Sequence, residues 1–494
     1  MSLRRLSLTL IFITGIIYLM ILGIVLFSPA YTFFHVDELT YFLSGKMFRE
    51  SSSIQAPFCF MEDVSPVFKT HWYGIFYHLF YGSILKITGF HAKIFIVINV
   101  VFILLSVLTL FRMNIPSDKK YFIAAMFLMS YPALVYSVMF FPEILHLFMA
   151  FPLIAILYRI WDLNRSGKGI SMFVMLFICM AALFTLFRIT YVFWLAALIP
   201  FSVNRWQFIG FTLLLTGGVV LTMLYMKYFT APAFVKSLAS LEKLEDFRIM
   251  EVLRDSATNF LYNVQVVFGY LWREVHIFVY LIFFVFTGVL ASREKNRFLA
   301  AAFLVSLLYI LSLLLLYNAY PFYFSKQTAT TLPLLITGLA IFTRKGKLEW
   351  ALLILMIIAL PFSVYALHRE TSNRLRAGKE LIAWHGEILE LEKIGQLAVG
   401  KKEIVIEVLH YEHKLPSYVF YASLPVSNKF GQPITYTASI HNVRLFPDLK
   451  YEDRFIRFGK LPVGFILSRE PLNMENVSLL YQGSFFYFYK DNRS

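Results

Sequence analysis

The sequence predicts an all-α polytopic membrane protein with about eleven transmembrane helices, a long first outer loop and a small C-terminal α/β domain outside the membrane. Of its 494 residues, 59% are hydrophobic and only 15% are charged, whereas soluble domains average about 25% charged residues. The apolar stretches are long and continuous, and they do not alternate as in outer-membrane barrels. These observations exclude a soluble globular enzyme, a disordered chain and a coiled coil.

The first apolar stretch extends from Leu6 to Phe34 without a charge and follows Arg4 and Arg5. A cleaved signal peptide has a shorter apolar core and a small-residue cleavage site, so we interpret this stretch as a retained first span. The further apolar stretches cover residues 94–111, 121–141, 144–158, 170–187, 189–203, 208–226, 277–292, 298–317, 328–343 and 350–367. A full span needs roughly 20 residues, so the pair at 170–203 is expected to be tilted or incomplete.

The formal net charge of +15 comes mostly from one set of alternate loops. With the N-terminus in the cytoplasm, the cytoplasmic segments are rich in Lys and Arg, whereas the short opposite turns near residues 141, 188 and 320 contain only Arg188 and Lys326 as basic residues. This positive-inside asymmetry accounts for the charge without any binding of nucleic acid. An odd number of spans then places three larger segments outside the cytoplasm: 30–92, 227–276 and 368–494. The general character of the sequence favours a multi-pass protein of the bacterial inner membrane over one of the endoplasmic reticulum.

The chain divides by composition into a membrane domain, residues 1–367, and a soluble extracytoplasmic α/β domain, residues 368–494. The second domain opens with a helical pattern at 376–397 and continues with strand-like runs at 403–409, 462–468 and 478–490. A further segment, 234–254, has the pattern of an amphipathic helix lying at the outer interface.

The first outer loop contains the residues best suited to acid–base chemistry. It opens with VDELTYF, in which Asp37 and Glu38 begin a predicted amphipathic surface helix and Tyr41 shares a helix face with Asp37. One interpretation is that the two acids cap the helix and favour its dipole. The alternative is that Asp37 acts as a carboxylate base that accepts a proton from a hydroxyl group, with Glu38 as its orienting neighbour.

Farther along the same loop, KTHWYGIFYHLFYG places Lys69 and His71 before a second aromatic-rich stretch. Tyr73, Tyr77 and Tyr81 follow each other at helical spacing, which is typical of an anchor at the membrane interface. Lys69 could bind a lipid phosphate as a point charge.

Three more charged residues are predicted at the same membrane face. Glu143 follows Pro142 at the start of a span, an ordinary helix beginning, and Arg188 lies between two apolar runs, where it either snorkels or faces a polar cavity. Lys326 begins a later span. Their shared depth with Asp37 and Lys69 indicates one site.

The sequence indicates no resident cofactor. The histidines lack HExxH spacing and no CxxC motif occurs, so we predict no structural metal site, although a divalent ion stays compatible with the chemistry. There is also no Gly-rich phosphate loop or dinucleotide-binding fingerprint.

The layout resembles the GT-C type membrane glycosyltransferases, which use polyprenyl-phosphate sugars and include the protein O-mannosyltransferases and the lipid A aminoarabinose transferases. Members carry an acidic motif just after the first span, matched here by Asp37, Glu38 and Tyr41. They also carry a Lys/His-containing segment, to which the stretch after Lys69 is similar without its proline pair, and a Pro-acid pair matched by Pro142 and Glu143.

The resemblance implies inverting transfer of a sugar from a polyprenyl-phosphate donor to a lipid, glycan or protein acceptor on the extracytoplasmic side. It implies a catalytic set of Asp37 as general base with Glu38 and Glu143, and a binding set of Lys69, His71, Arg188, Lys326 and Tyr41 for the donor phosphate and substrate. Two alternatives stay open: a flippase or transporter of lipid-linked glycans, and an O-antigen polymerase or ligase.

Overall fold

The computed structural model describes residues 2–32, 36–56, 58–59, 70–71, 75–89, 93–231, 243, 248–270, 274–316, 321–343 and 347–383, and, in the tail, 403–408, 427, 433, 435–440, 465–468, 471, 477–483 and 487–491. By contacts the chain forms two compact units. Unit 1 comprises residues 1–28, 93–223 and 239–372, and unit 2 comprises residues 29–92, 224–238 and 373–494.

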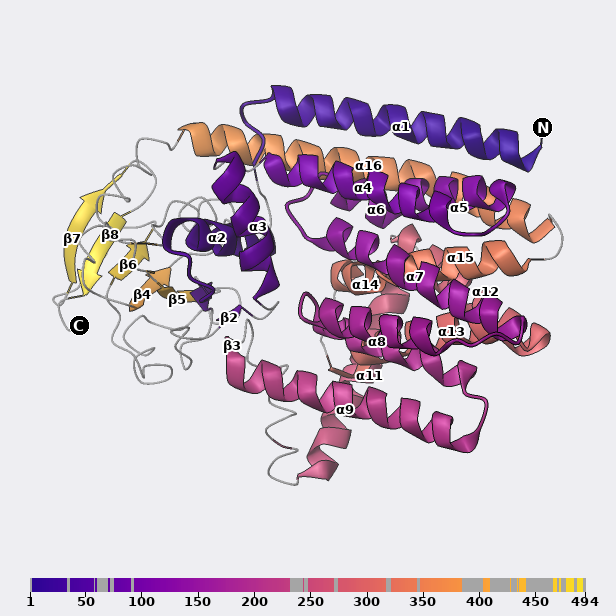
Figure 1. Cartoon of the computed structure of the whole chain (residues 1–494). Coiled ribbons are helices and arrows are strands. Elements are labelled where there is room, and N and C mark those ends of the chain that lie inside the picture. The colour runs from indigo at the N-terminus through magenta and orange to yellow at the C-terminus, as the bar shows by residue number, and fades with distance from the viewer. Residues whose placement is uncertain are drawn as a thin grey trace. The chain divides into compact units, whose positions relative to one another are not determined.

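The helices confirm the predicted fold class of a polytopic membrane protein. Among the described residues, seven helices are long and apolar enough to cross a bilayer: α1 (Leu3–Phe27), α4 (Ile94–Arg112), α7 (Glu143–Arg165), α9 (Arg205–Phe229), α12 (Val275–Glu294), α13 (Arg297–Leu316) and α16 (Lys347–Ala383). In Figure 1, the axes of α1, α4, α7 and α9 lie roughly parallel to one another. The chain is therefore an integral membrane protein.

The remaining predicted spans are shorter or broken. Residues 170–203 form two short helices, α8 (Ser171–Thr185) and the 3₁₀ helix η1 (Ile189–Phe201), as expected for incomplete spans. The prediction of a single span at 121–141 is wrong, because this stretch contains parts of two helices, α5 (Ser117–Met129) and α6 (Tyr131–Tyr136). The predicted stretch 328–343 contains one short helix, α15 (Leu332–Phe342), and a separate helix, α14 (Pro321–Thr328), ends where that stretch begins. In both α6 and α15 a proline lies in the first turn, where its missing N–H costs nothing.

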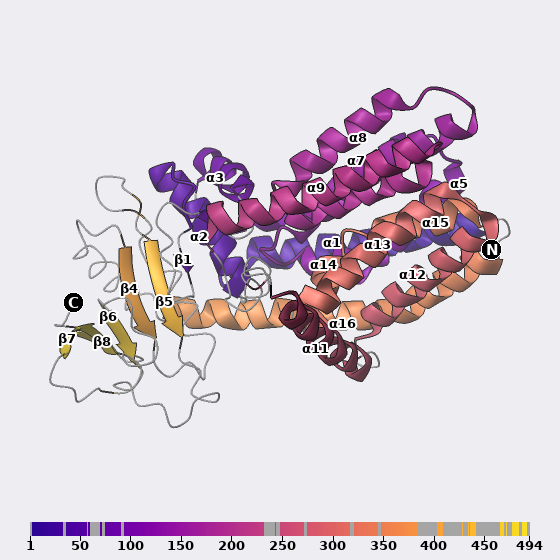
Figure 2. The same cartoon turned by 90° about the horizontal axis from the view of Figure 1, so that it is seen from below.

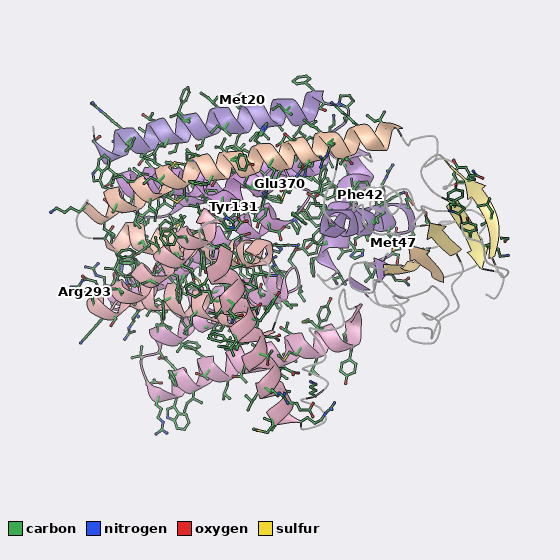
Figure 3. The ribbon with its side chains drawn as sticks, turned by 180° about the vertical axis from the view of Figure 1, so that it is seen from behind. Met20, Phe42, Met47, Tyr131, Arg293 and Glu370 are labelled. Atoms are coloured by element: carbon green, nitrogen blue, oxygen red, sulfur yellow. The ribbon has the colours of Figure 1, made fainter. Side chains whose placement is uncertain are left out.

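Burial separates a central helix from the outer ones. In the most apolar 18-residue stretch of α7, 67% of the residues are buried, whereas the corresponding stretch of α9 contains no buried residue. On α1, Phe12 and Leu19 are each 70% exposed, and Met20, which is labelled in Figure 3, is 64% exposed. Large apolar side chains directed outward along whole helices fit hydrocarbon as their solvent.

Helix α12 lies close against α13 because a glycine faces an aromatic ring. A Cβ at Gly288 would come within 2.7 Å of the Phe303 ring, and that ring stacks on Phe284 at 4.7 Å. Small residues of this kind let membrane helices approach closely where no hydrophobic force drives them together.

Helix α11 (Ile249–Tyr270) overlaps the end of the predicted amphipathic segment 234–254 and runs past residue 254. Within that segment the structure describes only residues 243 and 248–254. It is fixed to α13 by Asn263, which donates to the carbonyl oxygens of Leu313 and Leu314 at 3.3 and 2.9 Å.

Unit 2 contains a sheet of six strands in the order β1-β5-β4-β6-β8-β7 (Figure 2). The strands are β1 (Phe58–Cys59), β4 (Glu403–Val408), β5 (Thr435–Ile440), β6 (Phe465–Ser468), β7 (Val477–Gln482) and β8 (Tyr487–Asp491). Strands β4, β6, β7 and β8 lie in the predicted runs, whereas β5 was not predicted. Strand β1 comes from the first outer loop and pairs in parallel with β5, so the sheet is not built from the tail alone.

Helix α16 is a single helix of 37 residues. It begins as a predicted span and continues past the predicted domain boundary at residue 368 into the helical pattern predicted for the tail. Residues 384–397 of that pattern lie outside the described part. The sequence offers no helix stop at the boundary. Pro361 is the last proline before Ala383, and no glycine lies between Lys347 and Gly378.

Candidate functional site

Three of the predicted charged residues converge in unit 1. Glu143 begins α7, Arg188 lies between α8 and η1, and Lys326 belongs to α14. One carboxylate oxygen of Glu143, Oε1, lies 3.0 Å from a guanidinium nitrogen of Arg188 and 3.7 Å from Nζ of Lys326. Segments 45 and 183 positions beyond Glu143 thus place two cations on one carboxylate.

This cluster, Glu143 with Arg188 and Lys326, is almost completely shielded. The side chains of Glu143, Arg188 and Lys326 are 0%, 4% and 1% exposed. A charge can be buried to this extent only when it is paired, because its desolvation costs several kcal/mol (about 3–5 when a partner is removed). Arg188 therefore does not snorkel, and Glu143 is more than an ordinary helix start.

The local chain geometry explains how Arg188 reaches the cluster. Helix α8 ends at Thr185, and Arg188 itself has extended backbone angles, φ −152° and ψ 119°, before η1 begins. The break turns the chain inward, and the guanidinium also donates to the Lys326 carbonyl at 3.5 Å.

Aromatic and hydroxyl groups surround the cluster. The Lys326 ammonium lies 4.6 Å from the centre of the Phe141 ring, a cation–π contact. The neighbouring Ser325 shares a 2.8 Å hydrogen bond with the Tyr136 hydroxyl. Oxygen Oε2 of Glu143 has no hydrogen-bond partner among the described residues. Chemically, this is a polar centre in an apolar helix bundle, with two cations suited to an anionic group.

A second buried ion pair lies in unit 2, at the start of the first outer loop. Glu38 belongs to helix α2 (Val36–Ser51) and pairs with Arg374 of α16, and both side chains are fully buried. Glu38 is one of the residues predicted to be catalytic, whereas Arg374 is not among the predicted site residues. The only signal for Arg374 was a group of charged residues directly after the last apolar stretch.

The aromatic residues of this loop are packed inside unit 2. Tyr41 of α2 contacts Tyr77 of α3 (Phe76–Thr88) with 5.0 Å between ring centres, and Tyr77 stacks on Tyr81 at 6.3 Å. All three side chains are at most 2% exposed. Tyr77 and Tyr81 are therefore buried helix contacts, which corrects their interpretation as interface anchors.

A glycine allows α2 and α3 to approach this closely. A Cβ at Gly82 would come within 2.6 Å of the Phe48 side chain. Phe42 and Met47, shown in Figure 3, complete the buried face of α2.

The structure describes the other predicted site residues only in part. Asp37 lies in the first turn of α2, and His71 lies in the short strand β2 (Thr70–His71), which pairs with β3 (Thr230–Ala231). The side chains of Asp37 and His71, and all of Lys69, fall outside the described residues. Their roles stay predictions.

Replacing Arg374 with methionine should destabilise the protein by about 3–5 kcal/mol, because Glu38 would keep its charge in a buried place without its partner. Thermal unfolding in detergent or nanodiscs measures the effect. Arg376→Met, an exposed position two residues later on the same helix, is the matched control. Equal melting temperatures for the two variants would show that the Glu38–Arg374 pair contributes nothing to stability.

Comparisons with known proteins bear on the fold. No protein-family model matches the sequence, and no curated protein matches it. Among solved structures, ArnT from Cupriavidus metallidurans bound to undecaprenyl phosphate matches over 97% of each chain with 12% identity and a TM-score of 0.50.

Two structures of an oligosaccharyltransferase from Archaeoglobus fulgidus match with 12% identity. One is in complex with Zn and sulfate, with a TM-score of 0.47 over 95% of this chain and 68% of that one. The other is AglB in complex with an inhibitory peptide and a dolichol-phosphate, with a TM-score of 0.48 over 94% and 69%. The end-to-end match to ArnT, together with the helix pattern described above, shows that the chain has the GT-C fold of a polytopic membrane protein.

Proposed function

We propose that this protein is a membrane glycosyltransferase that uses a polyprenyl-phosphate-linked sugar as its donor. The observation that carries the proposal is the buried cluster of Glu143, Arg188 and Lys326 inside a bundle of apolar helices. Fixed cations in a water-excluded place suit a lipid-anchored phosphate. The fold is that of ArnT, which was solved with undecaprenyl phosphate bound.

The reaction would be one inverting displacement. Asp37 accepts the proton of an acceptor hydroxyl, and the hydroxyl oxygen forms a bond to the anomeric carbon of the sugar. The bond from that carbon to the phosphate oxygen breaks at the same time, and polyprenyl phosphate leaves with the electron pair. A carboxylate can serve as the base in this step because the proton transfer occurs as the new bond forms.

The leaving phosphate gains negative charge as the bond breaks, so cations fixed near it lower the barrier. Lys69, Arg188 and Lys326 are our candidates for this role. Glu143 would hold the two cations of the cluster in place, and His71 and Tyr41 would contact the substrate. The donor and a lipid, glycan or protein acceptor would meet on the extracytoplasmic side of a bacterial inner membrane.

Lys69→Ala and Arg188→Ala should weaken donor use. Losing a charge-assisted contact to phosphate costs about 1.5–3 kcal/mol, or roughly ten- to a hundredfold in affinity. The measurement is sugar transfer from purified polyprenyl-phosphate sugar, together with direct binding of undecaprenyl phosphate. A flippase or transporter would give no transfer product in this assay.

Lys93→Ala is the matched control, since Lys93 precedes α4 and its ammonium donates to the Leu26 carbonyl and not to a member of the cluster. If both test variants bind undecaprenyl phosphate as Lys93→Ala does, neither residue contacts the phosphate. Because Arg188 also pairs with Glu143, the amount of folded protein must be measured for each variant.

A further inference from the structure

Unit 1 contains a pocket between α6, α12, α14 and α16. Its polar lining residues are Ser130, Tyr131, His276, Tyr280, Ser325, Thr328 and Ser363, and its walls are otherwise apolar. No charged side chain lines it. The pocket has about 30 Å³ of free volume and is partly open, which is room for one or two hydroxyl groups but not for a whole ring.

The imidazole ring of His276 makes two contacts beside this pocket. Its imidazole stacks on the Tyr131 ring with 3.8 Å between centres and 12° between planes. Nδ1 lies 3.4 Å from a carboxylate oxygen of Glu274. Glu370 interacts electrostatically with Tyr131, and Figure 3 labels both residues.

The carboxylate of Glu274 determines whether Nε2, the other ring nitrogen of His276, donates or accepts a hydrogen bond. A negative charge beside Nδ1 favours the tautomer with its hydrogen on Nδ1, so that Nε2 carries a lone pair. Nε2 is buried and has no hydrogen-bond partner among the described residues. A ligand that fills this place must therefore donate a hydrogen bond.

Three hydroxyl groups of the pocket, those of Ser130, Thr328 and Tyr280, can also act as hydrogen-bond acceptors toward a ligand. Ser130 and Thr328 each donate to a backbone carbonyl of their own chain segment, at 2.6 and 2.7 Å. The Tyr280 hydroxyl lies 2.7 Å from the Thr331 hydroxyl, which itself donates to a carbonyl, so Tyr280 is the donor of that pair. Their hydrogens are used, and their oxygens keep lone pairs as acceptors.

We propose that this pocket binds the hydroxyl edge of a carbohydrate, with His276 Nε2 accepting one hydroxyl hydrogen and the pocket hydroxyl oxygens accepting another. The edge of a sugar carries several hydroxyl donors, which suits a small uncharged site where Nε2 and several hydroxyl oxygens can accept. Apolar walls suit the C–H faces between the hydroxyl groups of a sugar.

The carbohydrate has two possible sources, the sugar of the lipid donor or a separate glycan. Helix α14 connects the pocket with the Glu143 cluster, since Ser325 lines the pocket and Lys326 pairs with Glu143. The assignment to the donor rests on the proposed function; the binding of a carbohydrate does not.

The first experiment uses saturation-transfer NMR of the whole protein in nanodiscs with the methyl glycosides of glucose, mannose and galactose. We expect at least one glycoside to bind to the unmodified protein. His276→Phe, which keeps the ring stacking but removes Nε2, and Thr328→Val should each weaken its binding about three- to tenfold.

Thr287→Val is the control, because Thr287 of α12 is a buried threonine outside the pocket that makes the same 2.7 Å bond to a carbonyl four residues earlier. It should bind the glycoside like the unmodified protein. The proposal is overturned if no glycoside binds, or if all three variants bind it equally.

The second experiment identifies the source by competition. Displacement of the glycoside by undecaprenyl phosphate carrying the same sugar, and not by undecaprenyl phosphate itself, assigns the pocket to the donor sugar. Displacement by neither lipid assigns it to a separate glycan. Equal displacement by both lipids means that the pocket holds lipid, which overturns the proposal. Glycoside binding without any transfer activity would refute the proposed function alone.

Discussion

Replacing Asp37 with asparagine is expected to lower sugar transfer by about a hundred- to ten-thousandfold while donor binding and expression stay close to normal. The amide keeps the size of the carboxylate and can still cap helix α2, but it cannot accept the proton of the acceptor hydroxyl. A purely structural role for Asp37 predicts only a mild effect. The measurement is single-turnover transfer from purified polyprenyl-phosphate sugar.

Two further acids of α2 serve as controls for this variant. Glu50→Gln changes an exposed carboxylate at the other end of the helix, which accepts a hydrogen bond from Ser427, and should transfer at the normal rate. Glu38→Gln should lose stability through Arg374 but keep its rate per folded molecule. If Glu38→Gln is folded and inactive while Asp37→Asn transfers, the base is Glu38. If both variants transfer normally, these acids are structural and the transporter alternative gains support.

Replacing Glu143 with glutamine is expected to destabilise the protein by about 3–5 kcal/mol, because Arg188 and Lys326 both approach its carboxylate in a buried place. The amide is neutral and cannot compensate either cation. Thermal unfolding followed by the loss of folded protein in nanodiscs measures the change. Donor binding by the folded fraction should fall as well, since the two cations lose the group that positions them.

Asp162→Asn provides a control on the same helix. Asp162 pairs with Arg159 at 2.9 Å, but the Arg159 and Asp162 side chains are 45% and 35% exposed, and solvent-accessible pairs of this kind contribute at most about 1 kcal/mol. A Glu143→Gln protein that melts like Asp162→Asn would contradict the role of the cluster as a buried charge centre. Adding Lys326→Met to Glu143→Gln should recover part of the stability, because one uncompensated buried charge is then removed.

The sequence by itself determined the class of the protein and most of its helices. Continuous apolar runs predict transmembrane helices because hydrocarbon forces every backbone polar group to be satisfied within its own segment. Helix α2 was also predictable, since its acids and its apolar positions lie within one short segment. Such properties are local, so they can be read from neighbouring residues.

For the candidate site, the sequence determined the members but not their contacts. Glu143, Arg188 and Lys326 were each identified as charged residues at the end of an apolar run, where a charge is costly. Nothing in the sequence showed that two cations would approach the same carboxylate oxygen. That depends on the break between α8 and η1 and on the short helix α14, which lies before the predicted stretch 328–343.

Only the tertiary structure decided the partners that are distant in the chain. Arg374 lies more than three hundred positions from Glu38, strand β1 pairs with β5 across a similar separation, and His276 meets Tyr131 from another helix. Composition and periodicity report how a residue relates to its own helix or strand. Pairings between elements are set by which packing brings side chains into close contact while every buried charge finds a partner, and that balance exists only in the assembled fold.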